Sequence, residues 1–367
     1  MMIVVPCGDN PTAIWGMSNA ERLRRIATAA KLGFGDAPAD GPLLLVNLGF
    51  AFDPPLLRHM AGRADSVLVQ DGVPIIANLS DPALASAVAE AMSSGQALPA
   101  DLPLAFMIHD ENFSLHNDQL RKRERPFVMP LTPATRPAIE RASYYAAYKG
   151  VTDILTKYLW PEWALWLTRI AARLGITPNM VTAVGAILCL VATWLFWRGD
   201  YWPGMAAALG FMVLDTVDGK LARCTITSSW WGNVFDHGID LVHPPFWWWG
   251  WGVGLAAWEL ALSPEGFALV MAAIIGGYVV QRLIEGIFMR RYGMHIHVWE
   301  KIDSDFRLIT ARRNPNMVIL FVSLLFARPD LGLIAVAIWT IASLVFHAVR
   351  LVQAMTRRGA ITSWLMG

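Results

Sequence analysis

Four aspartates form two pairs at helical spacing in a stretch that otherwise has the composition of membrane helices. Asp215 and Asp218 are three residues apart, and Asp236 and Asp240 are four apart. Residues at these separations share one face of a helix, so the spacing predicts two helices that each present a pair of carboxylates. Acids within lipid are costly and mark functional sites. Facing carboxylate pairs suit hard divalent cations such as Mg²⁺ or Mn²⁺.

The residues around these aspartates follow a longer pattern. The chain fills every position of D-x2-D-G-x2-A-R-x8-G-x3-D-x3-D, whose other fixed positions are Gly219, Ala222, Arg223 and Gly232. The pattern resembles the signature of the CDP-alcohol phosphotransferases, which are integral membrane enzymes of phospholipid synthesis. The resemblance covers roughly residues 145–367.

The resemblance implies metal-dependent transfer of a phosphoalcohol or phosphatidyl group from a CDP-linked donor to an alcohol acceptor, with release of CMP. The four aspartates would hold two ions of Mg²⁺ or Mn²⁺, which could clamp the donor's pyrophosphate. Asp236 and Asp240 would belong to the catalytic centre, with Asp240 also acting as general base. Arg223, which stays protonated, would pair with diphosphate oxygens or else brace the aspartates.

Candidate nucleotide-binding residues lie in and before the pattern. By the resemblance, Gly219, Ala222 and Gly232 would line the cytidine pocket. Asn179 and Thr182 are about one turn apart at the start of the first expected span, where they could reach cytosine or ribose. A simple helix cap in this segment is the alternative.

Five further residues are candidates for contact with the rest of the substrate. Lys149 and Asp153 lie in a segment that resembles a family element near the headgroup, although Asp153 could equally cap a helix. Arg307, Arg312 and Arg313 are suited to an anionic substrate because the donors of arginine form a planar fork. A topological signal alone is the other interpretation of these arginines.

Other polar residues are expected to have structural roles. Arg282 and Glu285, three apart within an expected span, are predicted to form an intramembrane pair. Four histidines are predicted to be packing or interfacial residues rather than metal ligands: His237, His243, His295 and His297. Free, reduced thiols are expected for the three cysteines: Cys7, Cys189 and Cys224.

The composition indicates a membrane protein. Of 367 residues, 55% are hydrophobic and 16% are charged, there are 17 tryptophans, and the mean hydropathy is +0.41. The formal net charge of +1 gives no sign of a nucleic-acid partner. The first residues lack the basic region of a signal peptide and are typical of a β-strand.

The chain is expected to divide into a soluble α/β domain (1–135), a linker with an interfacial amphipathic helix (136–176) and a domain of six transmembrane helices (177–367). Strand-like and helical runs alternate in the first part: Ile3–Pro6, Asn19–Lys31, Leu43–Leu48, Pro55–Met60, Ser66–Val69, Pro74–Ala77 and Pro82–Met92. The basic segment Arg121–Arg141 is interpreted as a linker near anionic headgroups or as a solvated run of charge.

Six apolar segments follow the interfacial helix, whose Trp160, Trp163 and Trp166 suit the headgroup level. The expected spans are approximately 179–198, 203–222, 229–257, 266–289, 315–328 and 331–355, the fifth of them short. The basic residues between spans gather on one side: Lys220, Arg223, Arg290, Arg291, Lys301, Arg307, Arg312, Arg313, Arg357 and Arg358. The positive-inside rule therefore places the site and both termini toward the cytoplasm, in the cytoplasmic (inner) membrane.

The first 135 or so residues weakly resemble a nucleotidyltransferase domain, as in bifunctional enzymes that join an inositol-phosphate cytidylyltransferase to a CDP-alcohol phosphotransferase. The strand Ile3–Pro6 is not followed by a glycine-rich phosphate loop, and Leu48 and Gly49 stand where an acid for a metal is expected. Such a domain should not activate CTP. An inactive domain with a structural, dimer-contact or regulatory role is expected.

Two other classes of protein compete with the enzyme. One is a non-catalytic membrane scaffold with a relic motif, which four intact aspartates and Arg223 argue against. The other is a transporter, which would more often show paired broken helices in two repeats. By the resemblance the partners would be a CDP-linked donor, an alcohol, membrane lipids and a second copy in a homodimer. CDP-diacylglycerol with a polar acceptor and a polar CDP-alcohol such as CDP-inositol with a lipid both remain open, with the second favoured slightly.

Overall fold

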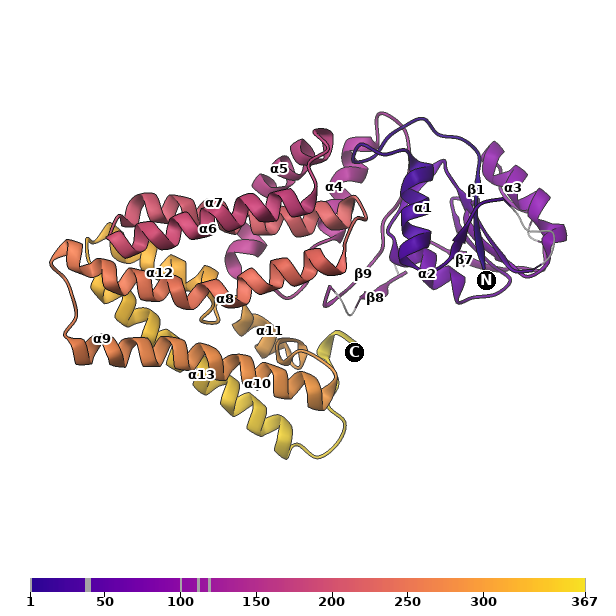
Figure 1. The fold of residues 1–367 in the computed structure, drawn as a ribbon. Helices are drawn as coiled ribbons and strands as arrows, with labels where there is room; N and C mark the ends of the chain where they lie inside the picture. Colours follow the sequence, from indigo (N-terminus) through magenta and orange to yellow (C-terminus); the bar gives the residue numbers. More distant parts are fainter. Residues whose placement is uncertain (1, 37–40, 100, 111–112, 118–119, 367) are drawn as a thin grey trace. The chain divides into compact units, whose positions relative to one another are not determined.

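The computed structural model describes residues 2–36, 41–99, 101–110, 113–117 and 120–366 (Figure 1). The chain forms two compact units. The first, called here the α/β unit, comprises Met1–Tyr148, Arg169–Ile176 and Lys220–Ser228; the second, the helical unit, comprises Lys149–Thr168, Thr177–Gly219 and Ser229–Gly367. The two units are described separately.

The α/β unit is built on a six-stranded mixed sheet. Its strands are β1 (Ile3–Cys7), β2 (Gly33–Phe34), β3 (Leu43–Asn47), β5 (Ser66–Gln70), β6 (Val73–Leu79) and β7 (Ala105–Ile108). The strand order is β2-β1-β3-β6-β5-β7, and β6 runs antiparallel to both of its neighbours while the other pairs are parallel.

The two faces of this sheet bury alternate side chains of the strands, as a period of two requires. Leu44 and Val46 of β3 pack on one face with α1 (Asn19–Ala29) and α2 (Pro55–Ala61). Their neighbours Leu43 and Leu45 pack on the other face with α3 (Ala85–Ser94), which follows the short helix η1 (Pro82–Leu84). A strand buried on both faces reads as a continuous apolar run, which is why the sequence predicted it.

The α/β unit extends beyond the boundary predicted at residue 135. The segment expected to be a linker contains β9 (Lys122–Glu124), which pairs with β8 (Leu115–Asn117), β10 (Val128–Pro130), which pairs with β4 (Phe50–Phe52), and the helix α4 (Arg136–Ala146). Val128, Ile139 and Tyr144 are buried, so this segment adds to the core. Part of its basic charge is neutralised internally, because Glu140 pairs with Arg136 and Arg169.

Long helices make up the helical unit: α6 (Pro178–Arg198), α7 (Tyr201–Cys224, whose last turn belongs to the α/β unit), α8 (Trp230–Gly254), α9 (Pro264–Met271), α10 (Gly277–Tyr292), α12 (Arg313–Leu325) and α13 (Pro329–Thr356). The shorter elements are η2 (Leu155–Leu159), α5 (Pro161–Arg173), η3 (Leu255–Trp258), η4 (Ala272–Gly276), η5 (Ile296–Val298), α11 (Lys301–Arg307) and η6 (Trp364–Met366). Figure 1 shows α6 beside α7 and α10 beside α13.

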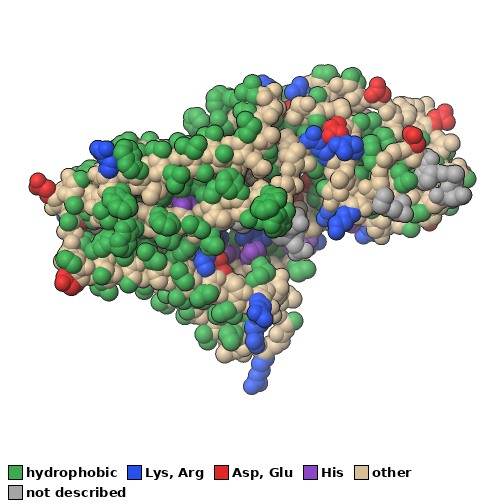
Figure 2. Space-filling view, viewed as in Figure 1, with side chains coloured by type: hydrophobic (Ala, Val, Ile, Leu, Met, Phe, Trp, Pro, Cys, Tyr) green, Lys and Arg blue, Asp and Glu red, His purple; other side chains and the backbone are tan. Residues whose placement is uncertain are grey.

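Three helices among the described residues are long and apolar enough to cross a membrane: Pro178–Arg198, Pro264–Tyr292 and Pro329–Thr356. The second joins α9 to α10 through η4. Apolar side chains cover much of the visible face of the helical unit (Figure 2). On α5, Trp163 and Trp166 are exposed, whereas Trp160, which precedes the helix, is buried. The interfacial role of this helix stays a prediction.

The core of the helical unit is rich in aromatic side chains. Trp247, Trp248 and Trp251 of α8 are buried, and the Trp247 indole donates to the Cys189 carbonyl of α6. Tyr201 stacks on Trp251 with ring centroids 4.2 Å apart. These tryptophans therefore hold α8 in place and leave its first turns to carry the aspartates. The three cysteines are buried and free, as predicted.

Candidate active site

The aspartates of the motif lie on α7 and α8. On α7, the Asp215 side chain is 16% exposed and Asp218 is buried. Asp240 on α8 is more open, with a side chain 45% exposed. Asp236 lies on the same helix one turn earlier, but its side chain and that of His237 are outside the described ones.

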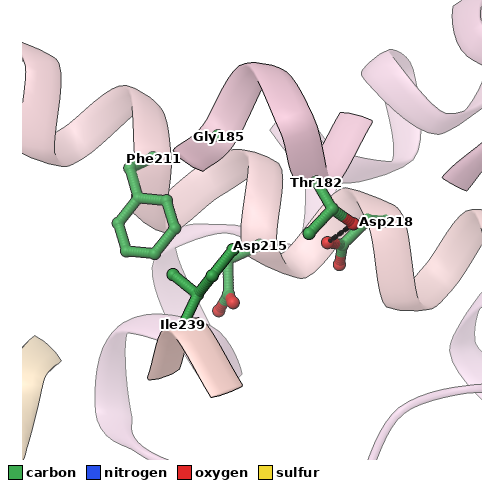
Figure 3. Close-up of a pocket in the computed structure, with 6 residues that line it drawn as sticks. All are labelled: Thr182, Gly185, Phe211, Asp215, Asp218 and Ile239. Atoms are coloured by element: carbon green, nitrogen blue, oxygen red, sulfur yellow. Dashed lines mark hydrogen bonds between the residues drawn. The ribbon is translucent and has the colours of Figure 1, made fainter. Parts of the chain in front are cut away.

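A small cavity of about 10 Å³ lies between the three helices that meet here. It is lined by Thr182, Gly185, Phe211, Asp215, Asp218 and Ile239, and Figure 3 shows Asp215 and Asp218 on its wall. This volume is at the lower limit for one water molecule. The cavity has room for a single small ion and none for a nucleotide, which would have to approach from the open side near Asp240.

Thr182 on α6 holds one of the acids. Its hydroxyl donates to Asp218 Oδ2 over 2.6 Å, the dashed line in Figure 3. The other Asp218 oxygen accepts from the Gly219 amide over 2.5 Å. Thr177 caps α6 by accepting from the Met180 amide, which fixes the turn that carries Thr182. The Thr182 hydroxyl, which was predicted to reach a nucleotide, is thus bonded to Asp218, a candidate metal ligand.

Arg313, at the start of α12, joins two aspartates. Its two terminal nitrogens lie 2.6 Å from Asp215 Oδ2 and 2.6 Å from Asp240 Oδ1. Its Nε donates to Asn314 Oδ1 over 3.0 Å. The arginine proposed to contact an anionic substrate therefore lies within the aspartate site.

Asn179 and Gly232 bring the first turns of α6 and α8 together. A Cβ atom placed on Gly232 would come within 3.1 Å of Asn179 Oδ1 and 3.0 Å of Ser229 Oγ. Ser229 caps α8 by accepting from the Gly232 amide. A side chain here would crowd both neighbours unless they shifted by a few tenths of an ångström, so the close approach favours glycine. The amide of Asn179 is placed beside the glycine of the motif.

Asp153 is buried, whereas Lys149 is exposed. The Asp153 carboxylate accepts from the Thr156 amide and hydroxyl and from Asn314 Nδ2, at 3.0, 2.8 and 3.0 Å. Burial raises the pKa of Asp153, but the charge of Arg307 and these hydrogen bonds outweigh it and hold the pKa below its usual value. The bond from the Thr156 amide to Asp153 is a helix-capping contact, which is the alternative to a headgroup contact that the sequence left open for Asp153.

A second polar cluster lies around Glu285 of α10. The Glu285 carboxylate accepts from Arg282 over 2.7 Å and from Arg312 over 2.5 Å, and His297 Nε2 lies 3.3 Å away. The predicted pair of Arg282 and Glu285 is confirmed. Burial holds the pKa of His297 well below its ordinary value despite the neighbouring carboxylate, so this imidazole is neutral.

Among the described residues, the ligand atoms of Glu285, His297 and His347 form the one group within 4.8 Å of one another that has the chemistry of a metal site. Arg312 Nη2 lies 3.0 Å from His297 Nε2 as well as on Glu285. The guanidinium of Arg312 thus already supplies the positive charge that a metal ion would bring to this group. The sequence analysis missed His347, which bonds to Gln281 over 3.2 Å, because these residues are far apart in the chain.

His243 has the packing role that was predicted for it. Its imidazole is buried, lies 2.7 Å from the Ile239 carbonyl and contacts the rings of Phe211 and Trp247 edge-on.

The remaining residues of the motif belong to the last turn of α7. Ala222 and Arg223 are half-buried and, like Lys220, are part of the α/β unit. The Lys220 ammonium lies 2.8 Å from the centre of the Tyr148 ring, a cation–π contact within that unit. The role proposed for Arg223 stays a prediction.

The ends of the parallel strands in the α/β unit carry no comparable group of acids among the described residues. Asn47 ends β3, and its amide nitrogen donates to the carbonyls of Pro74 and Met92 while its oxygen accepts from the Gly49 amide. Asp53, six residues further along the chain, is buried. Burial and the negative charge of Glu124 raise its pKa to about 6, although the positive charges of Lys122 and Arg22 act in the opposite direction.

Comparison with known proteins gives a family for the helical part. Residues 175–346 match the family model described as CDP-alcohol phosphatidyltransferase. This segment contains every position of the motif, and it includes α6, α7, α8, α10 and α12. The segment is therefore similar to the CDP-alcohol phosphatidyltransferase family, and this similarity together with the apolar helices indicates an integral membrane protein.

Curated relatives match over the same part of the chain. Cholinephosphotransferase 1 of Gallus gallus is 34% identical over 134 residues, which are 33% of this chain and 38% of that protein. Its counterpart of Homo sapiens is 31% identical over 159 residues, 41% of this chain and 37% of that protein. An uncharacterized CDP-alcohol phosphatidyltransferase class-I family protein of Schizosaccharomyces pombe is 31% identical over 107 residues, 26% of this chain and 28% of that protein. The matched stretch thus spans less than 40% of each of these relatives.

Proposed function

We propose that the chain is a CDP-alcohol phosphotransferase, which transfers a phosphoalcohol or phosphatidyl group from a CDP-linked donor to an alcohol and releases CMP. The observation that carries this proposal is the meeting of Asp215, Asp218 and Asp240 at the facing parts of α7 and α8, within the segment that matches the family.

The donor set fits divalent metal ions. Asp215, Asp218 and Asp240 offer only carboxylate oxygens, the ligands preferred by Mg²⁺ and Mn²⁺. The cavity beside Asp215 and Asp218 has the size of one small ion. Two bound ions, with Asp236 as a fourth ligand, would neutralise charge on the diphosphate and on the leaving CMP.

The other steps fall to the protein's own side chains. Thr182 would orient Asp218, to which its hydroxyl donates. Asp240, the more exposed acid, would accept the proton of the acceptor hydroxyl. Arg223 and Arg313 are the arginines proposed to bind diphosphate oxygens, because their planar forks match phosphate. Gly219, Ala222, Gly232 and Asn179 would form the wall against cytidine.

The relatives are named for transfer of cholinephosphate, which favours a polar CDP-alcohol as donor. We propose six membrane spans, formed by α6, α7, α8, the continuous α9–α10 helix, α12 and α13, with the site and both termini on the cytoplasmic side of the inner membrane. We also propose a homodimer and a catalytically inactive, nucleotidyltransferase-like α/β unit. Inactivity is supported by Asn47 at the end of β3, whose side-chain amide is bonded to main-chain groups.

A substrate panel tests the proposal. Purified full-length protein in lipid–detergent micelles would be incubated with Mg²⁺ or Mn²⁺, with CDP-choline, CDP-inositol or CDP-diacylglycerol, and with lipid or polyol acceptors. We expect CMP release for a specific donor–acceptor pair and no pyrophosphate release from CTP. Failure to bind either metal or CDP compounds would overturn the enzyme and favour a membrane scaffold.

A further inference from the structure

The start of α12 carries three consecutive polar residues that each reach an acid from another part of the helical unit. Arg312 pairs with Glu285 of α10, Arg313 pairs with Asp215 and Asp240, and Asn314 donates to Asp153. Among the described side chains, Arg313 alone of the three contacts aspartates of the motif.

We propose that Arg313 is the resident counter-ion of the aspartate site: it joins Asp215 to Asp240 before a divalent metal binds, and it competes with the metal for their carboxylate oxygens. The inference rests on the proposed function in one respect, namely that these aspartates bind a divalent metal.

The position of Arg313 is fixed on several sides. Only 12% of its side chain is exposed. Each terminal nitrogen is held by a carboxylate at 2.6 Å, Nε is held by Asn314, and Cζ lies 4.9 Å from the centre of the Phe211 ring. An exposed arginine that met these acids by chance would not have all its nitrogens bonded and one face of its guanidinium against an aromatic ring. The bridge is therefore a built feature of the site.

Arg313 and a metal ion would need the same carboxylates. Mg²⁺ binds carboxylate oxygens at about 2.1 Å, whereas the Arg313 nitrogens now occupy Asp215 Oδ2 and Asp240 Oδ1. Among the described side chains, Asp215, Asp218 and Asp240 do not form a group as compact as the one around Glu285. The guanidinium occupies one oxygen of Asp215 and one of Asp240, and its positive charge opposes a cation held beside it. The metal and Arg313 therefore compete for these carboxylates.

Competition between Arg313 and the metal should couple metal binding to donor binding. Breaking the bridge opposes metal binding, and a freed guanidinium near the site would pair with phosphate oxygens. A CDP-linked donor, which brings a diphosphate, should therefore favour the released state of Arg313 and tighten metal binding. By linkage, the metal should tighten donor binding by the same factor.

Manganese binding provides the test. Mn²⁺ affinity would be measured by electron paramagnetic resonance on the full-length protein in micelles, with and without CDP-choline as the diphosphate probe. We expect Arg313→Gln to bind Mn²⁺ about tenfold more tightly than the wild type when CDP-choline is absent. In the wild type CDP-choline should tighten Mn²⁺ binding about tenfold, and in the variant less than about twofold.

Arg312→Gln is the matched control, because it removes the same charge from the adjacent residue while its partner is Glu285. Its Mn²⁺ affinity should stay within about threefold of the wild type, which would be the effect of net charge alone. If Arg313→Gln does not fold, Arg313→Met replaces it; a methionine side chain has neither charge nor N–H donors and cannot hold the carboxylates, so binding should again tighten.

Each result distinguishes the two claims. Unchanged or weaker Mn²⁺ binding in the Arg313 variants, or equal tightening in Arg312→Gln, would overturn the counter-ion role and leave the proposed enzyme standing. Failure of the wild type to bind Mn²⁺ with or without CDP-choline would overturn the metal site itself, and with it both proposals.

Discussion

Buried polar side chains are satisfied in different ways in the two units. Asn47 of the α/β unit is bonded entirely to main-chain groups, which cannot be exchanged without moving the strand. Asp215 and Asp240 of the helical unit are held by one arginine side chain, and Asp218 by a threonine and an adjacent amide. Partners on side chains can be replaced by a ligand. The comparison indicates where the molecule is built for stability and where for chemistry.

The same contrast separates two glutamates, the buried Glu140 and the half-buried Glu285. Glu140 of the α/β unit pairs with Arg136 and Arg169, whose side chains are 36% and 28% exposed. Glu285 of the helical unit pairs with Arg282 and Arg312, which are 22% and 24% exposed, and it contacts a neutral histidine. The arginines of the helical cluster are more enclosed, although the Glu285 side chain is 16% exposed against 5% for Glu140. Removal of the glutamate charge should therefore cost more where the arginines have less access to water.

The largest difference is expected when a buried aspartate of each unit becomes an amide. Asp218→Asn should lower CMP release about 1,000-fold, because a metal ligand and its charge are lost, a change of about 4 kcal/mol in the activation barrier. Asp53→Asn in the α/β unit should change the rate less than about twofold. Rates of CMP release at saturating donor provide the measurement. Equal losses in both variants would remove the distinction between the units.

The next effect concerns stability. Glu285→Gln leaves two enclosed arginines without their anion and should lower the free energy of unfolding by about 3 kcal/mol. For Glu140→Gln, whose arginines can be hydrated, the loss should be about 1 kcal/mol. Unfolding of both variants by titration with sodium dodecyl sulfate in micelles compares them. A larger loss for Glu140→Gln would contradict the ranking.

A smaller effect should follow from the hydroxyl that orients Asp218. Thr182→Val removes this donor and should weaken Mn²⁺ binding about 10- to 100-fold, as loss of a hydrogen bond to a metal ligand does. Thr193→Val on the same helix is the control, since among the described residues its hydroxyl bonds only to the Cys189 carbonyl. Equal affinities of the two valine variants would show that Thr182 does not position Asp218.

How far the site could be predicted depends on sequence distance. The aspartate spacing was enough to predict the shared face of Asp215 and Asp218 on α7, whereas the face of Asp236 and Asp240 on α8 stays a prediction. Continuous apolar runs were enough to predict β3 and β5. The bridge from Arg313 to Asp215 was not predictable, because it depends on where the start of α12 lies. The cluster of Glu285, His297 and His347 was missed for the same reason. The strands β9 and β10 were missed because they are short and charged or proline-flanked.

The smallest expected effect is a pH dependence in the α/β unit. The pKa of Asp53 is raised to about 6 by burial and by Glu124. The folded state therefore binds this proton more tightly than the unfolded chain, so its contribution to stability is present at low pH and is lost as the pH rises through 6. Between pH 5 and pH 7 the loss should be about 1 kcal/mol.

Hydrogen exchange of the β4 and β10 amides in the full-length protein can detect this loss. Asp53→Asn should abolish the part of the pH dependence that remains after correction for intrinsic exchange. An unchanged slope in the variant would assign the pH dependence to another group.

The central claim is that the aspartates on α7 and α8 catalyse transfer from a CDP-linked donor. Its most direct test is CMP release by Asp240→Asn beside Asp200→Asn, an acid on the loop before α7 whose side chain is 44% exposed, close to the 45% of Asp240. With the donor–acceptor pair that supports release, Asp240→Asn should be about 1,000-fold slower, as expected when a general base is lost, and Asp200→Asn should match the wild type. Undiminished release by Asp240→Asn would contradict the claim.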